Sequence, residues 1–84
     1  MCQFKLGNLN SALESYAAAL AIFTEVGDDL MQAECREGLS ETYMAAGDRA
    51  TALEVLRMAE GLYSKLKHPR LGDVRRLLSD IEGN

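Results

Sequence analysis

The chain has 84 residues with 48% apolar and 26% charged side chains, which excludes wholesale disorder and leaves room for one small domain. Its formal net charge is −4. Because a nucleic-acid binder needs a basic face to neutralise phosphates, this charge argues against that class of protein.

The number of cysteines and the hydropathy of the chain indicate its cellular compartment. Cys2 and Cys35 are too few for a disulfide framework, which fits a reducing compartment. The apolar stretch at residues 17–22 is far too short to cross a bilayer. We therefore expect a cytoplasmic protein that makes no contact with membranes.

The first predicted helix lies between Leu9 and Phe23, where apolar residues recur at spacings of three and four. Ser11 and Glu14 have capping-box spacing and predict its start. Gly27 predicts its end, since glycine is the preferred residue just beyond a helix C-terminus.

A second helix is predicted over residues 29–46, in which apolar residues lie four apart. They are Met31, Cys35, Leu39 and Tyr43. Asp28 and Asp29 suit the positive N-terminal end of this helix. Because Cys35 lies on the apolar stripe, we expect a small buried hydrophobe there rather than a reactive thiol.

The third helix is predicted from the apolar stripe at residues 53–66, and Pro69 marks the end of this unit. Two starts are open, which are a capping box of Thr51 with Glu54 and an N-cap at Asp48. No strand alternation occurs, and the short connections make successive helices antiparallel neighbours.

A shorter helix is predicted after Pro69, with an apolar stripe at residues 71–81. Basic residues gather around it, namely Lys65, Lys67, Arg70, Arg75 and Arg76. Most such groups are solvated helix ends, but Arg75 and Arg76 lie near a helix start and are candidates to meet the acidic face of a second copy.

An internal repeat links the first and third helices at a shift of 40 residues. The matched pairs include Gly7 with Gly47, Ala12 with Ala52, Leu13 with Leu53, Glu14 with Glu54 and Ala19 with Ala59. Small and acidic residues in matching positions exceed what amphipathicity requires, so we interpret the pattern as a duplication.

Residues 33–69 resemble the tetratricopeptide repeat (TPR) pattern. Its positions are filled by Leu39, Tyr43, Gly47, Ala52, Leu56 and Ala59, with Pro69 after them. The period near 40 is similar to the longer-helix variant of kinesin light chains and of spindle-orientation and G-protein-regulating scaffolds.

This resemblance implies an all-α, antiparallel helical-hairpin solenoid with a right-handed superhelix. Residues 1–84 would form a single TPR-like domain. Within it, residues 1–27 would be a partial repeat holding only a second helix, 28–68 a full repeat, and 69–84 a terminal capping-type helix.

Four positions depart from the family pattern. Arg36 and Ser40 replace an aromatic and a small residue, and Glu60 replaces the apolar residue found at Leu20. Gly38 lies inside the second helix, at a cost of about 1 kcal/mol against alanine.

Catalysis has no support in the sequence. His68 is the single histidine and precedes a proline, and no phosphate loop, nucleophile motif or metal-ligand spacing occurs. We therefore expect a non-enzyme with no cofactor and no metal.

The resemblance implies that the first helix of a repeat lines a concave groove. The corresponding groove candidates are Glu34, Glu37, Glu41, Met44 and Ala45. An acidic groove would prefer a basic or amphipathic protein or peptide. The alternative is that the three glutamates, which share one helix face, are simply solvated.

Two functions are open at this point. The first is a protein-interaction scaffold that uses this groove. The second is a truncated or self-associating structural piece, because the helix at residues 9–26 lacks the partner that a complete repeat would give it. A homo-oligomer of the isolated chain is then expected.

Overall fold

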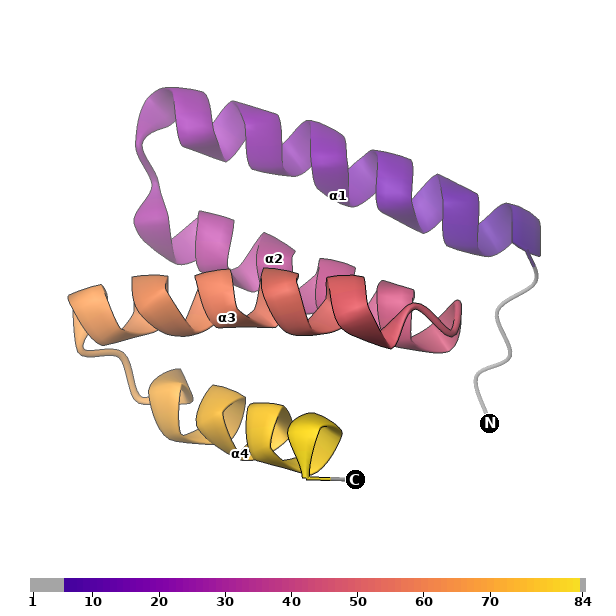
Figure 1. Cartoon of the computed structure of the whole chain (residues 1–84). Helices are drawn as coiled ribbons and strands as arrows, with labels where there is room; N and C mark the ends of the chain where they lie inside the picture. Colours follow the sequence, from indigo (N-terminus) through magenta and orange to yellow (C-terminus); the bar gives the residue numbers. More distant parts are fainter. Residues whose placement is uncertain (1–5, 84) are drawn as a thin grey trace.

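The structure, a computed structural model, describes residues 6–83 and contains four helices in that range with no strand. They are α1 (Leu6–Val26), α2 (Asp29–Ala45), α3 (Arg49–Leu66) and α4 (Arg70–Glu82). Each runs antiparallel to the one before it (Figure 1). Backbone contacts join only successive helices, so the chain is an all-α helical solenoid, as the sequence predicted.

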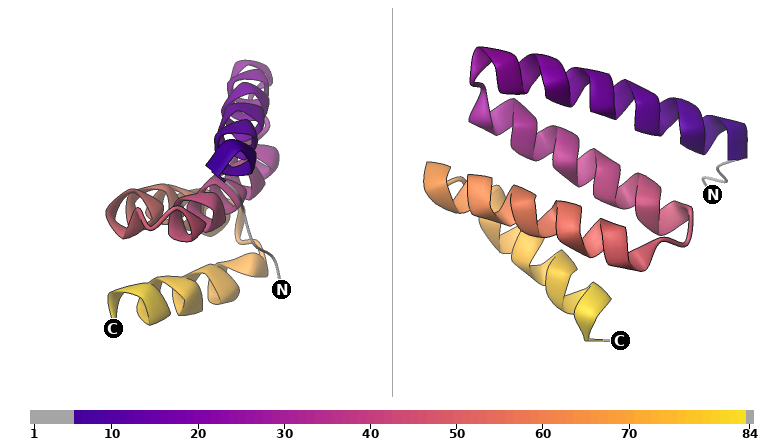
Figure 2. Two further views of the ribbon diagram at one scale, coloured as in Figure 1. Left: turned by 90° about the vertical axis from the view of Figure 1, so that its right-hand side faces the viewer. Right: turned by 45° about the horizontal axis from the view of Figure 1, so that its top comes forward.

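The helices form a stack rather than a closed bundle. Figure 2 shows α2 and α3 side by side as a central layer, with α1 on one side of it and α4 on the other. The stack measures 35 × 32 × 21 Å. Such a stack leaves one side of α1 exposed, whereas most of α2 is covered by its neighbours.

Two glycine turns set the helix directions. Gly27 and Gly47 have φ angles of +76° and +84°, which glycine adopts without the strain of a side chain. The aspartates that follow, Asp28 and Asp48, accept hydrogen bonds from backbone amides in the first turns of α2 and α3. These caps fix where each helix begins.

The capping box predicted at Ser11 is wrong, and of the two open starts of the third helix the N-cap at Asp48 is the one that the structure has. Ser11 lies inside α1, and Thr51 lies one turn inside α3, where its amide donates to Asp48 Oδ1 at 3.2 Å. The upstream aspartate thus caps α3, while the Thr51–Glu54 spacing has no capping role. The extent predicted for the second helix was one residue too long at its C-terminal end.

The core lies between α2, α3 and α4. Ala52 and Ala59 have no exposed surface, as expected where two helices approach closely. Tyr63, Leu56 and Val74 are the largest fully buried side chains. Burying such side chains supplies most of the free energy that holds three helices together.

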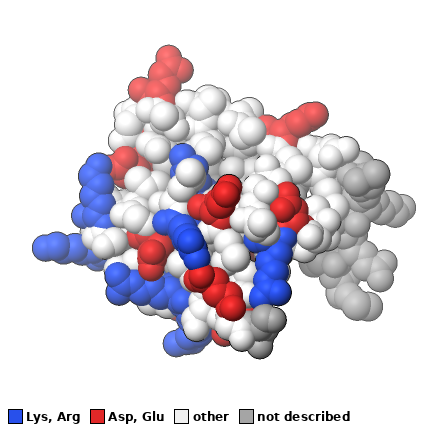
Figure 3. All heavy atoms as spheres, in the orientation of Figure 1, with Lys and Arg blue, Asp and Glu red and all other residues white. Residues whose placement is uncertain are grey.

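The terminal helix α4 is fastened to α3 by surface ion pairs, Arg57 with Glu82 and Arg75 with Glu60. Glu60, a departure from the family pattern, therefore has an ion-pair partner within the chain. Arg75 is likewise engaged within the chain, so the suggestion that it waits for a second copy loses its basis. In Figure 3 the Lys and Arg atoms of this face lie mainly over α3 and α4.

The α1 helix exposes large apolar side chains near its C-terminal end. Ile22 and Val26 are 59% and 70% exposed, whereas Leu62, which matches Ile22 in the internal repeat, packs against the core. The bare apolar face expected for the first helix is therefore present in the structure.

Candidate functional site

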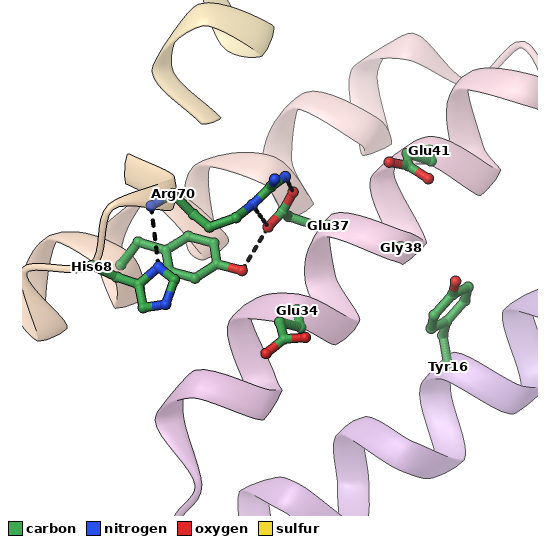
Figure 4. Close-up of a pocket in the computed structure, with 8 residues that line it drawn as sticks. Tyr16, Glu34, Glu37, Gly38, Glu41, His68 and Arg70 are labelled. Atoms are coloured by element: carbon green, nitrogen blue, oxygen red, sulfur yellow. Dashed lines mark hydrogen bonds and ion pairs between the residues drawn. The ribbon is translucent and has the colours of Figure 1, made fainter. Parts of the chain in front are cut away.

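A hollow of about 420 Å³ opens along the face of α2 that carries the three glutamates. Glu34, Glu37 and Glu41 all line it, and Gly38 lies among them (Figure 4). The sequence placed these glutamates on one helix face, and the structure brings them to one site.

The two sides of the hollow come from other elements. Tyr16 reaches across from α1 toward Gly38 (Figure 4). On the opposite side, Tyr63 comes from α3, His68 from the turn that follows it, and Arg70 from the start of α4.

Glu37 differs from the other two glutamates because it is buried, with an exposed fraction of 8%. The Tyr63 hydroxyl donates to its Oε1 at 2.5 Å. The Arg70 guanidinium donates to both carboxylate oxygens, with Nε 3.1 Å from Oε1. A bidentate ion pair with an added hydroxyl bond satisfies this carboxylate, so its charge is neutralised inside the chain.

The pKa values of its partners follow from this arrangement. Burial, reinforced by the hydrogen bond to Glu37, raises the pKa of the Tyr63 phenol above its usual range. The hydrogen bond to Glu37 raises the pKa of the Arg70 guanidinium. Tyr63 thus stays a neutral donor and Arg70 a cation throughout the physiological range.

The turn between α3 and α4 positions Arg70 beside Glu37. The backbone amide of Arg70 donates to His68 Nδ1 at 3.1 Å, and the His68 ring lies 5.1 Å from the Tyr63 ring centroid. Lys67, at a left-handed φ of +53°, ends α3 and redirects the chain. His68 is therefore a partly buried residue that helps to position the start of α4.

Glu34 and Glu41 remain available to a ligand. Both are exposed, and neither forms an ion pair within residues 6–83. They lie seven residues apart, two turns along one face of α2, on either side of the neutralised Glu37. The hollow is thus flanked by two open carboxylates.

Of the predicted groove residues, Met44 and Ala45 are exposed but lie beyond the hollow at the C-terminal end of α2. Tyr16, Tyr63, His68 and Arg70 were not predicted as site residues. Tyr63 lies within the apolar stripe predicted at residues 53–66, which indicates only a helix, and no local signal joins Glu37 to Arg70, 33 residues away.

Other chemistry finds little support in the described part of the chain. The Cys35 thiol is buried as predicted, and burial raises its pKa, which lowers its reactivity. Cys2 lies outside the described residues. No group of three or more metal-binding side chains occurs within residues 6–83, and no helix there is long and apolar enough to span a membrane.

A stack of antiparallel helix pairs, with an open lateral face and a 40-residue internal repeat, defines a helical-repeat protein. The family model described as Tetratricopeptide repeat matches residues 1–65, so the chain belongs to the tetratricopeptide repeat family. Searches against curated proteins and against solved structures returned no match. Members of this family generally mediate protein–protein interaction and are typically non-catalytic scaffolds.

Proposed function

We propose that this chain is a non-catalytic protein-interaction module that binds a basic or amphipathic peptide across the hollow on α2. The observation that carries the proposal is the pair of exposed carboxylates, Glu34 and Glu41, which lie on either side of a neutralised Glu37. Neither has an ion-pair partner among the described residues. A lysine or arginine of the partner would supply the missing positive charge.

The remaining residues of the site suit the same ligand. Tyr16 offers an aromatic ring beside the carboxylates, and cations are attracted to the faces of such rings. Met44 and Ala45 extend an exposed apolar surface beyond Glu41, which would accept the apolar side of an amphipathic peptide.

In this proposal Glu37 does not contact the peptide. Its oxygens are already bound by Arg70 and Tyr63, so it orders the floor of the site instead of attracting the peptide. A substitution at Glu37 would disturb the fold and is a poor test of binding.

The test uses a basic and an acidic amphipathic peptide of equal length, titrated against the wild type and the variant Glu34→Gln/Glu41→Gln. Each exposed ion pair contributes about 0.2 to 1 kcal/mol, so the loss of two costs about 0.4 to 2 kcal/mol. We therefore expect the basic peptide to bind roughly twofold to thirtyfold more weakly to the variant. We expect weak or no binding of the acidic peptide to either protein.

The matched control is Glu25→Gln/Glu54→Gln, which changes the net charge equally at exposed carboxylates outside the hollow. It should keep near wild-type affinity at physiological salt, where charges beyond about 8 Å are screened. An equal loss in both double variants would mean that net charge, and not this site, drives binding.

Self-association is the second candidate function, favoured by the exposed small apolar side chains of Ala17 and Ala21 on α1. The cytoplasm is the compartment we propose for either function, since a buried free thiol at Cys35 suits a reducing environment.

A further inference from the structure

A second, apolar groove lies between α1 and α2, away from the glutamate hollow. Its volume is about 760 Å³, and its apolar lining consists of Leu13, Ala17, Leu20, Ala21, Leu39 and Tyr43. The proposed peptide site shares none of these residues. A partner in this groove need not occupy the peptide site, so the inference below rests on the self-association candidate and not on the peptide proposal.

The internal repeat supplies a comparison for this groove within the same chain. At a shift of 40 residues, the residues of this groove correspond to those of a groove between α3 and α4. In that groove, Arg57 occupies the position of Ala17, and Glu60 occupies that of Leu20. There, ion pairs from Arg57 to Glu82 and from Glu60 to Arg75 link the two helices. Since the same geometry tolerates a charged lining, the fold alone does not require the first groove to be apolar.

Arg36 is the single base among the described residues that line the apolar groove. Its Nη1 donates to Met58 Sδ at 2.9 Å, which is a weak acceptor, and its buried Nε has no hydrogen-bond partner within the described residues. It forms no ion pair with any of them either. A partner of this groove should therefore bring a carboxylate to Arg36.

The helix α1 itself has the features that such a partner needs. Its exposed Ala17 and Ala21 permit a close helix approach, and Glu14 and Glu25 lie at the edge of the same stripe. We propose that α1 of a second copy docks in this groove, antiparallel to α1, to form a symmetric dimer.

Two contacts between α1 and α2 set the level of Arg36 along α1, and the two-fold axis that we propose at Ala17 then sets the register of the dimer. Gln32 Nε2 donates to the carbonyl of Phe23, and Gly38 lies against the Tyr16 ring, so Arg36 is level with residues 18–20. A two-fold axis through Ala17 pairs position 14 of one copy with position 20 of the other. Glu14 of the second copy then lies level with Arg36, and the same pair forms twice by symmetry.

The first measurement is sedimentation equilibrium of the wild-type chain between about 1 and 100 μM, the range where a modest dimer dissociates. We expect a monomer–dimer equilibrium. A wild type that stays monomeric over this range overturns the proposal.

A charge swap then tests the interface. Arg36→Glu and Glu14→Lys should each weaken the dimer at least tenfold, because each places like charges opposite one another twice. An equal mixture of the two should restore a heterodimer, since both contacts then join opposite charges. Circular dichroism checks that each variant is helical. If Arg36→Glu does not fold, Arg36→Gln is used alone and should weaken the dimer by removing both ion pairs, so an unchanged dimer would again reject the pairing.

The matched control is Ile22→Glu, an exposed apolar residue of α1 that does not line the groove. It should leave the dimer intact. A dimer that is lost with Ile22→Glu and kept with Arg36→Glu places the interface on the other face of α1, and a mixture that fails to recover the dimer rejects the pairing. Either result overturns the proposal.

Discussion

At the scale of single residues, the contact between Gly38 and Tyr16 decides how α1 meets the site-bearing face of α2. A Cβ atom built on Gly38 would lie 2.4 Å from two ring carbons of Tyr16. The sequence indicated only the intrinsic cost of a glycine inside a helix. The structure gives its reason, because any larger residue would displace the tyrosine ring from the hollow.

This contact predicts that the effect of Gly38→Ala on the free energy of unfolding changes sign when the Tyr16 ring is removed. In the wild type, overpacking against Tyr16 costs about 1–3 kcal/mol and outweighs the gain of roughly 1 kcal/mol in helix propensity. In a Tyr16→Ala background the ring is absent, so the same substitution should stabilise the fold. Urea unfolding of the four proteins in this double-mutant cycle gives the coupling free energy.

The coupling between the two positions is expected to be about 1–3 kcal/mol. Equal effects of Gly38→Ala in both backgrounds would show that the ring turns away at no cost. The helical content of each variant, followed by circular dichroism, serves as the control.

For Glu37, the sequence predicts the helix face on which the residue lies but not the ion pair that it forms. Helical spacing correctly placed Glu34, Glu37 and Glu41 together, because that spacing depends only on local geometry. Whether each carboxylate is open or neutralised depends on Arg70, which the α3–α4 turn brings back across the stack. A contact over 33 residues has no signal in one sequence.

At the scale of helices, the first turn of α3 is stabilised by the side chain of Asp48. Asp48 Oδ1 accepts the Thr51 amide at 3.2 Å, which satisfies one of the free amides of the first turn. We predict that Asp48→Ala lowers the free energy of unfolding by about 1 kcal/mol, and that Asp48→Asn costs much less because the amide oxygen still accepts. Thermal or urea unfolding measures both.

Ser11→Ala is the informative control for Asp48→Ala. Ser11 has the same spacing to a glutamate as Thr51, but it lies exposed inside α1 and caps nothing. Its replacement by alanine should be neutral or stabilise slightly through helix propensity. A loss near 1 kcal/mol there would show that α1 begins at Ser11 in solution.

The helices themselves were well predicted, and their ends less so. Apolar spacing defines a helix over many residues, so a single ambiguous position does not change the outcome. An N-cap depends on one hydrogen bond, and two nearby candidates such as Asp48 and Thr51 cannot be ranked by spacing alone. The bonded amide of Thr51 decides between them.

At the scale of the whole molecule, stability should vary along the stack. Backbone contacts join only neighbouring helices, so α1 and α4 each depend on a single backbone interface. In such an array the terminal helices open more easily than the central pair. Arg70 adds a link from the first residue of α4 to Glu37 of α2, past the intervening helix α3.

That link predicts a local effect of Glu37→Gln in hydrogen exchange followed by mass spectrometry. The substitution removes the ion pair with Arg70 but keeps an acceptor for Tyr63, so amides of α4 should exchange about fivefold to tenfold faster, the equivalent of roughly 1 kcal/mol. Amides of α1 should be unaffected, since α1 packs on a different face of α2. The wild type should protect the centres of α2 and α3 most strongly.

Glu60→Gln is the control that separates this long link from the surface pairs between α3 and α4. It removes the exposed contact with Arg75, whose contribution is expected to be smaller than that of the largely buried Glu37. If Glu60→Gln speeds exchange in α4 as much as Glu37→Gln does, Glu37 adds nothing beyond a surface ion pair. If Glu37→Gln also speeds exchange in α1, the carboxylate stabilises the entire stack, and α4 is not held separately by Arg70.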